Sequence, residues 1–490
     1  MNLKSLAKDT AIYGLSSIVG RFLNYLLVPL HTYRIAAESG GYGIVSNLYA
    51  YAALIFALLT FGMETTFFRF SGRKDEDEKM VYSCALRMVG AVGLGFVALV
   101  FAFLGGISDA LGYAAHPEYV AWFAVIGALD AFQAVMFARL RQQHRPMKFM
   151  LLKMSFIFLN VALNLFIFLL MPKIPQLTAI YERFNGGVGL IFFANLLCTS
   201  LVTLGFIPEI RGIAYGFDRS LCKRMLAYSM PLLLLSLVSI LNQTADKVLF
   251  PLLCPGEEGM VQLGIYGACV KIAMIMALLT QAFRYAYEPI VFSGAEKNSP
   301  KTLADGMKYF VIFTLAAFLC VIFYMPVLRH FVQQDYWEGL GTIPVVMMAE
   351  IFMGISMNLS FWYKLSDKTW WGALISLCGA VVMVAVNVIF VPRIGYWACA
   401  WGGFAGYGIS MLLSYFLGQK YYPVRYELRS IGLYVLLALV LLLLYYLPEI
   451  LGFEPGTWVK MALGTVLLAA YCTPLALTML RKLKSKSKHA

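Results

Sequence analysis

Long apolar runs dominate this sequence, and they limit the folds that are open to it. We count fourteen runs of about 20 mostly apolar residues, each long enough as an α-helix to cross a hydrocarbon core roughly 30 Å thick. Of the 490 residues, 61% are hydrophobic and only 13% are charged, and the mean hydropathy is +0.75, which lies outside the range of soluble domains. We therefore predict an all-α polytopic membrane protein.

The predicted spans alternate regularly along the chain. They cover residues 10–32, 42–64, 84–105, 118–138, 149–171, 187–208, 226–252, 262–283, 303–325, 340–363, 369–391, 396–418, 430–447 and 458–480. With both termini in the cytoplasm, 30 of the 39 Lys and Arg residues lie on that side, six lie on the other side and three lie within spans. This asymmetry follows the positive-inside rule, and one missed or invented span would destroy it. We predict fourteen transmembrane helices and two cytoplasmic termini.

Several functional classes are disfavoured by what the sequence contains. The formal net charge is +13, but the basic residues form short tracts between apolar runs, which indicates membrane topology rather than a nucleic-acid partner. The nine cysteines are odd in number and form no CxxC pair, so we expect neither a disulfide framework nor a metal site. The loops are short, and they carry no Walker-type or dinucleotide-binding motif. We predict no cofactor and no enzyme, and transport driven by an ion gradient, the membrane potential or the substrate gradient.

Two segments of the chain repeat each other. The second span reads YGIVSNLYAYAALIFALLTFGM from Tyr42, and the eighth reads LGIYGACVKIAMIMALLTQAF from Leu263. Both share a Gly-Ile pair and an Ala-Leu-Leu-Thr run at an offset of about 220 residues, and both run in the same direction across the membrane. Transporters are often built from such repeats. We predict an N-terminal six-helix lobe at 1–210, a cytoplasmic linker at 211–224, a C-terminal six-helix lobe at 225–420, and two further helices with a basic tail at 421–490.

Three segments resemble a known family. They are SLAKDTAIYGLSSIVGRFLNYLLVPLHT near the start, FGMETTFFRF at 61–70, and MPLLLLSLVSILNQTADKVLF from Met230. They are similar to the polysaccharide transporter branch of the multidrug/oligosaccharidyl-lipid/polysaccharide exporter superfamily, which includes bacterial O-antigen and capsule flippases. The resemblance implies two six-helix bundles around a V-shaped cavity in the inner membrane. It also implies movement of an undecaprenyl-pyrophosphate-linked oligosaccharide by alternating access.

Three cations lie within apolar spans, where a charge is costly and usually has a function. They are Arg21, Lys247 and Lys271. Ser17 and Asn24 share one helix face with Arg21, which gives that face a polar character. Two hypotheses stay open for these cations: pairing with a carboxylate such as Asp130 or Glu350, or lining a cavity that binds an anion. In the related lipid II flippases basic residues on the first and eighth spans line the cavity, and Arg21 and Lys271 occupy those two spans here. We predict substrate binding by Arg21 and Lys271, and also by Asn24 and Lys247.

Asp246 heads a second polar group within a span. Asn242 and Gln243 lie four and three residues before it and share its face. Lys247 points about 100° away, so we expect that it does not simply neutralise Asp246. The group is either a site for a coupling H⁺ or Na⁺, or an interhelical cluster of hydrogen bonds, or an ion pair with a residue elsewhere in the bundle.

Glu64 and Arg69 lie at the predicted cytoplasmic end of the second span. We consider them as a candidate gate salt bridge, with a solvated helix end as the alternative. The leading hypothesis for the whole chain is a flippase whose partners are a lipid-linked oligosaccharide, membrane lipids and other glycan-assembly membrane proteins. The alternative is a cation-coupled exporter of drugs or metabolites, for which twelve spans and an acidic cavity are expected.

Overall fold

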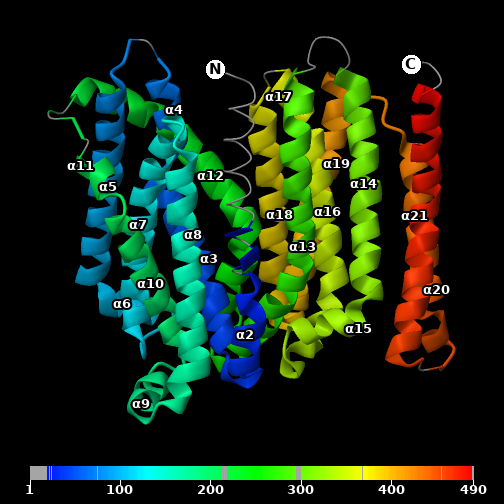
Figure 1. Cartoon of the computed structure of the whole chain (residues 1–490), viewed down its shortest axis with the longest axis horizontal. Helices are drawn as coiled ribbons and strands as arrows, with labels where there is room; N and C mark the ends of the chain where they lie inside the picture. The colour runs from blue at the N-terminus through cyan, green and yellow to red at the C-terminus, as the bar shows by residue number, and fades with distance from the viewer. Residues whose placement is uncertain are drawn as a thin grey trace. The chain divides into compact units, whose positions relative to one another are not determined.

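The computed structural model describes residues 19–20, 22–23, 25–73, 75–211, 213–214, 216, 218–293, 299–366, 368–453 and 455–487. These residues form helices and loops and contain no β-strand (Figure 1). The contacts divide the chain into two compact units, Met1–Gly267 and Ala268–Ala490. The all-α class is therefore confirmed, while the predicted lobes and linker stay predictions.

The first unit holds the helices up to the start of α13. They are α2 (Leu27–Arg34), η1 (Ala37–Ser39), α3 (Gly41–Thr60), α4 (Met63–Ser71), α5 (Glu78–Ala102), α6 (Leu104–Ala110), α7 (Pro117–Gln142), α8 (Pro146–Leu165), η2 (Phe166–Leu170), η3 (Met171–Lys173), α9 (Pro175–Arg183), α10 (Val188–Leu204), α11 (Ile207–Arg211), α12 (Arg219–Leu253) and α13 (Glu257–Ser293). The unit boundary falls within α13.

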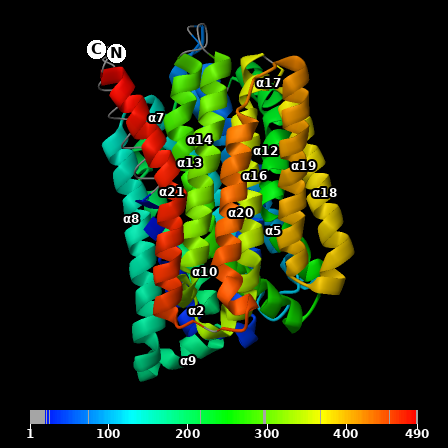
Figure 2. The ribbon, with the colours of Figure 1, turned by 90° about the vertical axis from the view of Figure 1, so that its right-hand side faces the viewer.

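The second unit holds the remainder of α13 and the helices that follow it. They are α14 (Ser299–Phe323), α15 (Met325–Leu328), η4 (Arg329–Phe331), η5 (Gln334–Thr342), α16 (Ile343–Leu359), α17 (Phe361–Leu365), α18 (Trp370–Ile394), α19 (Trp397–Tyr421), α20 (Leu428–Ile450) and α21 (Thr457–Ser487). The last two helices pack on each other and on α14 (Figure 2).

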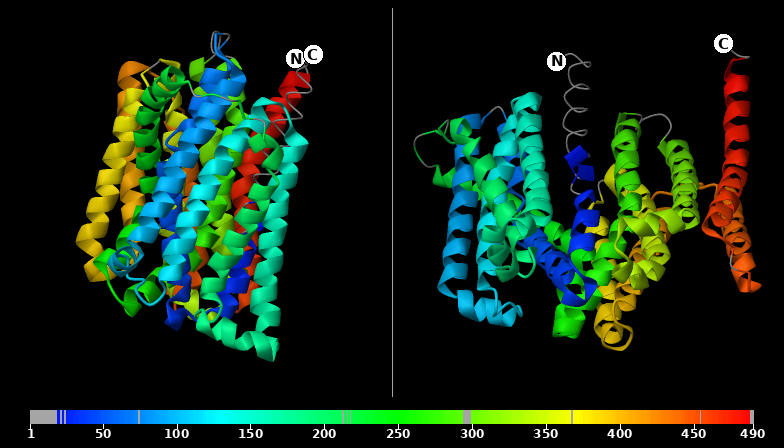
Figure 3. Two further views of the ribbon diagram at one scale, coloured as in Figure 1. Left: turned by 90° about the vertical axis from the view of Figure 1, so that its left-hand side faces the viewer. Right: turned by 60° about the horizontal axis from the view of Figure 1, so that its bottom comes forward.

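Among the described residues, 11 helices are long and apolar enough to cross a membrane, or up to 12 if the bent pair of α9 and α10 forms one span. These two helices meet at 97°, and α9 turns away from the end of α8 (Figure 3). The helix α19 matches the predicted span 396–418, but it is rich in Gly and Tyr and is not among the 11. Most of the predicted first span, 10–32, lies outside the described residues. The chain is thus a multi-pass membrane protein, and the number fourteen stays a prediction.

Local signals explain where several helices begin and break. Asp77 caps α5 by accepting a hydrogen bond from the backbone N–H of Lys79, and Asp218 caps α12 in the same way through Leu221. The predicted span 42–64 is divided between α3 and α4 at Phe61 and Gly62, which both have positive φ. Gly62 suits this break because a glycine adopts positive φ without strain.

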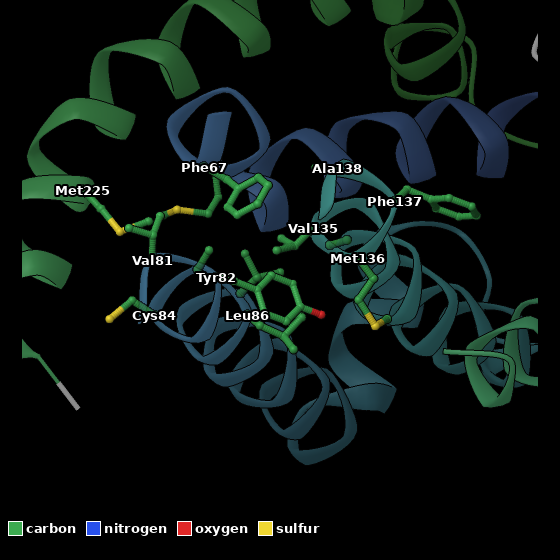
Figure 4. Close-up of a cluster of buried hydrophobic side chains, with 14 of the residues drawn as sticks. Phe67, Val81, Tyr82, Cys84, Leu86, Val135, Met136, Phe137, Ala138 and Met225 are labelled. Carbon is green, nitrogen blue, oxygen red and sulfur yellow. The ribbon is translucent and has the colours of Figure 1, made fainter. Parts of the chain in front are cut away.

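A large apolar cluster holds the first unit together. Phe67 of α4, Tyr82 of α5 and Met136 of α7 are fully buried members of this cluster, and the ring centres of Phe67 and Tyr82 lie 6.1 Å apart (Figure 4). Burial of such side chains contributes roughly 1.5 to 3 kcal/mol each. This cluster fixes the positions of α4, α5 and α7, and α7 carries two of the charged groups discussed below, Asp130 and Arg141.

Candidate functional site

A pocket of about 450 Å³ lies inside the first unit and is lined by residues of α3, α4, α7, α8 and α10. Its charged and amide residues are Glu64, Asp130, Gln133, Arg141 and Lys153. Its apolar wall includes Phe56, Phe137, Phe149, Leu152, Phe156, Ile157 and Val202. An apolar pocket with a few convergent polar groups is the usual form of a binding site in proteins.

The pocket-facing residues of α7 follow the helical period. Asp130, Gln133, Phe137 and Arg141 occur at steps of three and four residues, so they lie in one stripe along the helix. The stripe runs from the middle of α7 to its last turn. A single helix thus places a carboxylate deep in the pocket and a guanidinium at its other end.

Asp130 belongs to a polar group shared by α7 and α10. The hydroxyl of Thr199 lies 3.4 Å from Oδ1 of Asp130, as a long donor contact. One turn along α7, Nε2 of Gln133 donates to the backbone oxygen of Thr199 at 2.9 Å and to the hydroxyl of Thr203 at 2.8 Å. Gln133 therefore fixes α10 against α7 and holds Thr199 beside the carboxylate.

The candidate gate of Glu64 and Arg69 is wrong in its pairing. Glu64 forms an ion pair with Arg141 of α7 instead. Arg69 lies over the ring of Tyr228 of α12, with its guanidinium carbon 4.2 Å from the ring centre. Arg69 follows Glu64 by five residues, more than one helical turn, so the two side chains diverge on α4.

Lys153 was missed as a site residue. It lies close to the start of its predicted span, and the charge count assigned it to the cytoplasmic side. In the structure it lines the pocket from α8, with its ammonium nitrogen 4.5 Å from the ring centre of Phe137. It also lies within electrostatic reach of Asp130. The signal that could have found it is the presence of a lysine two turns beyond Pro146, inside an apolar run.

The expected separation of Asp246 and Lys247 is also wrong. Nζ of Lys247 lies 2.9 Å from Oδ2 and 3.1 Å from Oδ1 of Asp246, and the hydroxyl of Tyr266 donates to Oδ2 at 3.0 Å. Neighbouring residues leave a helix about 100° apart, but the four-carbon stem of lysine is long enough to bring the ammonium back to the carboxylate. Asp246 is therefore paired with its own neighbour rather than with a cation elsewhere in the bundle.

The two amides that precede Asp246 bond within their own helix. Nδ2 of Asn242 donates to the backbone oxygen of Val238, and Nε2 of Gln243 donates to that of Ser239, both at 3.2 Å. Gln243 is exposed and Asn242 is partly buried. The described contacts of these amides include no hydrogen bond to Asp246.

A buried hydrogen-bond chain connects this part of α12 to α3. Nδ2 of Asn47 donates to the backbone oxygen of Lys247 at 2.7 Å, and the Tyr113 hydroxyl donates to Oδ1 of Asn47 at 2.6 Å. Tyr113 lies in the loop between α6 and α7, and burial raises the pKa of its phenol, so the hydroxyl stays a donor at neutral pH. Tyr266 thus holds the carboxylate of Asp246, and Asn47 holds the backbone of Lys247.

The remaining predicted substrate-binding residues are placed as follows. Lys271 is partly buried on α13, in the second unit. Arg21 and Asn24 lie outside the described residues. Their roles stay predictions.

The helices define a multi-pass membrane protein with charged groups inside its spans. A family model described as polysaccharide biosynthesis protein matches residues 6–291, more than half of the chain. The chain therefore belongs to the polysaccharide biosynthesis protein family, a family of transporters. A comparison with the curated proteins gives no match.

Solved structures show the same fold. The chain is similar to the lipid II flippase MurJ in an inward closed conformation, with a TM-score of 0.74 and 14% identity over 96% of this chain and 99% of that one. It is also similar to an inward-facing multidrug resistance MATE family transporter of the MOP superfamily, with a TM-score of 0.62 and 16% identity over 81% of this chain and 93% of that one. At these identities the likeness defines the fold alone.

Proposed function

We propose that this protein is a flippase that moves a polyprenyl-pyrophosphate-linked oligosaccharide across the bacterial cytoplasmic membrane by alternating access. The carrying observation is the match to the polysaccharide biosynthesis family over residues 6–291. The fold likeness to a lipid flippase supports it, because that likeness covers nearly the full length of both chains. O-antigen and capsule repeat units are the substrates that this proposal implies.

The proposal includes a topology of fourteen spans, six in each lobe and two more at the end, with both termini in the cytoplasm. The charge distribution of 30 cations against six supports it. The extra helices α20 and α21 also support it, because they follow the twelve spans expected of an exporter.

We propose further that Arg21 and Lys271 bind the pyrophosphate, with Asn24 as a polar neighbour. A pyrophosphate loses hydration in the membrane, and fixed cations replace part of it. Lys247 would have to leave its pair with Asp246 before it could join this site.

Reconstituted flipping tests the function. Liposomes that contain the purified protein and a fluorescent polyprenyl-pyrophosphate oligosaccharide should show lipid transfer between leaflets. Arg21→Glu and Lys271→Glu should each lower the rate at least tenfold, whereas the exposed control Lys301→Glu should not. Arg21→Lys should keep part of the rate, because it retains the charge and loses only the planar fork.

The alternative is a cation-coupled drug or metabolite exporter, which the likeness to a MATE transporter favours. Export of cationic drugs by the same liposomes, with no transfer of the oligosaccharide lipid, would decide for the exporter. Normal flipping by both charge-reversal variants would instead refute the proposed anion site.

A further inference from the structure

The second unit carries a cluster of aromatic rings and lysines where α17, α18 and α19 meet. α17 packs on α16 and α19, and Trp371 at the start of α18 contacts Tyr421 at the end of α19 (Figure 2). The two connections that carry the lysines of this cluster, after the predicted spans 340–363 and 396–418, both lie on the predicted cytoplasmic side. The cluster therefore lies at the level where these helices meet the membrane surface.

Tyr421 is the centre of the cluster. Its ring stacks on that of Trp362, with 6.0 Å between the ring centres, and lies 5.5 Å from the ring of Trp371. Trp362 is itself fully buried, and its indole N–H donates to the hydroxyl of Ser414 at 3.3 Å. The two tryptophans therefore hold the Tyr421 ring in place as a platform.

Two lysines share this platform. Nζ of Lys368 lies 4.5 Å from the ring centre of Tyr421, and Nζ of Lys420 lies 5.7 Å from it. Groups this close to one ring are at most about one Debye length apart, roughly 10 Å at 0.1 M salt, so their repulsion is not fully screened. Both lysines are exposed, and their charged contact within the described part of the chain is with this ring rather than with a carboxylate; Asp367 lies outside that part. An anion bound at this patch would relieve the repulsion.

Exposed apolar side chains continue from the patch along both helices. On α18, Trp370 is 74% exposed, and the exposed Leu374 follows it one turn later on the same face. On α19, the exposed residues Leu412 and Phe416 precede Lys420 by eight and four residues, so they share its face. Each helix thus presents an apolar stripe that ends at the charged patch.

We propose that this patch binds the phosphate of an anionic phospholipid, whose acyl chains lie along the stripes of α18 and α19. Lysines at the membrane surface attract anionic lipids, and tryptophan is preferred at the level of the headgroups. The start of α18 adds the positive end of its helix dipole, since Thr369 provides no side-chain cap there. By the predicted topology the lipid belongs to the cytoplasmic leaflet. The inference does not depend on the proposed function.

A phospholipid fits the patch better than other anions do. A soluble phosphate would contact only the ammonium groups, whereas a phospholipid also covers the exposed rings of Trp370 and Phe416. A polyprenyl pyrophosphate offers the same charge chemistry but has a single tail. Two apolar stripes, one on each helix, suit the two acyl chains of a phospholipid.

Native mass spectrometry of the full-length protein in detergent tests the binding. The wild type should retain phosphatidylglycerol at least threefold more than phosphatidylcholine. The double variant Lys368→Gln with Lys420→Gln should lower the retention of phosphatidylglycerol at least threefold, because both charges are lost. Lys301→Gln, which removes an exposed lysine of α14, is the control and should change nothing. Equal retention of phosphatidylglycerol by the wild type and the double variant would overturn the proposal.

Photo-crosslinking locates the lipid. A phosphatidylglycerol with a diazirine in one acyl chain should label peptides that contain Leu374 or Phe416, and the double variant should lose this label. Labelling of other helices alone would overturn the assigned site. Thermal unfolding in lipid-free detergent should be the same for the wild type and the double variant, since both lysines are exposed. This equality assigns a lost label to lost binding rather than to misfolding.

Competition separates the two lipid sources. Unlabelled phosphatidylglycerol should reduce the labelling of α18 and α19 at a lower concentration than a polyprenyl-pyrophosphate oligosaccharide does. The reverse order would overturn the phospholipid assignment and give the patch to the transport substrate. A wild type that does not flip the oligosaccharide lipid but retains phosphatidylglycerol at this patch would refute the proposed function and leave the lipid site standing.

Discussion

Gly43 and Gly264 meet through their backbones. A Cβ atom on Gly264 would lie 2.9 Å from the amide nitrogen of Gly43, and one on Gly43 would lie 1.9 Å from the backbone oxygen of Met260. These two glycines hold equivalent places in the repeat, in Tyr42-Gly43-Ile44 and Leu263-Gly264-Ile265. The two repeated segments thus touch at the same position of the repeat, and both of these positions lie in the first unit.

A larger side chain at Gly264 should force apart α13, which carries this residue, and α3, which carries Gly43. We expect Gly264→Leu to destabilise the protein by at least 1 to 3 kcal/mol, roughly the cost of overpacking, because the obstacle is backbone rather than a flexible side chain. Thermal unfolding in detergent measures this. Gly95→Leu is the matched control, since Gly95 has nothing within 4 Å of its Cβ position. Equal stability of the two variants would contradict the close contact.

Glu209 joins the end of α11 to the connection between α7 and α8. Its buried carboxylate lies 3.0 Å from Nη1 of Arg145 and 2.6 Å from Nζ of Lys148. We expect Glu209→Gln to lower the free energy of unfolding by about 1 to 3 kcal/mol, because two cations lose their acceptor while Arg145 can still reach water. The exposed residue Glu257 supplies the control Glu257→Gln. Identical unfolding temperatures for the two variants would show that the cluster is not stabilising.

The sequence was sufficient to predict the class and most helices. The prediction of a span at 118–138 is matched by α7 at Pro117–Gln142, because about twenty apolar residues between charged ends leave a chain in lipid no alternative to a helix. The composition and motifs also led to the correct family, which the match over 6–291 confirms. The hydrophobicity and length of each segment are enough to predict a membrane-spanning helix, because neither depends on contacts with distant residues.

The partners of charged side chains could not be predicted in the same way. Glu64 pairs with Arg141, 77 residues away, and only the packing of α4 against α7 brings them together. The lysine at 247 was misplaced for another reason: helix geometry gives the direction of a Cβ atom but not the end of a long, flexible stem. The pocket around Asp130 depends on five helices, and no spacing in the sequence reports it.

Asn387 is an unusual residue on α18. It is fully buried, and neither its amide oxygen nor its amide nitrogen has a hydrogen-bond partner among the described residues. We expect Asn387→Leu to keep or raise stability, by up to about 1 kcal/mol, because it removes a polar group that is buried without compensation. Thermal unfolding again measures this. A clear loss of stability would point to a polar partner of Asn387 and contradict its unsatisfied state.

Cysteine accessibility can test the fourteen-span topology. A cysteine placed at Lys486 should resist membrane-impermeant reagents in intact cells, and one placed at Glu257 should react, because the charge distribution places them on opposite sides. Glu257 is exposed at the first residue of α13, so the label has access there. External labelling at Lys486 would require an odd number of spans or an inverted chain.

Asp246 and Lys247 offer a double-mutant test of whether an ion pair in a span is structural. We expect Asp246→Asn and Lys247→Met each to reduce stability by about 1 to 3 kcal/mol, since each leaves one buried charge without its counter-charge. The double variant should regain most of this loss, because no charge then remains. The measured quantity is the coupling free energy from thermal unfolding of the four proteins.

Flipping by the same four proteins separates the pair's stability from its use in transport. If the ion pair is only structural, the flipping rate should fall wherever stability falls. The double variant should then regain both its stability and its flipping rate. An inactive double variant with restored stability would instead show that Asp246, Lys247 or both take part in transport. We expect recovery, because Asp246 already has two short contacts, from Nζ of Lys247 at 2.9 Å and from the hydroxyl of Tyr266 at 3.0 Å, which favours a structural pair over one that opens repeatedly.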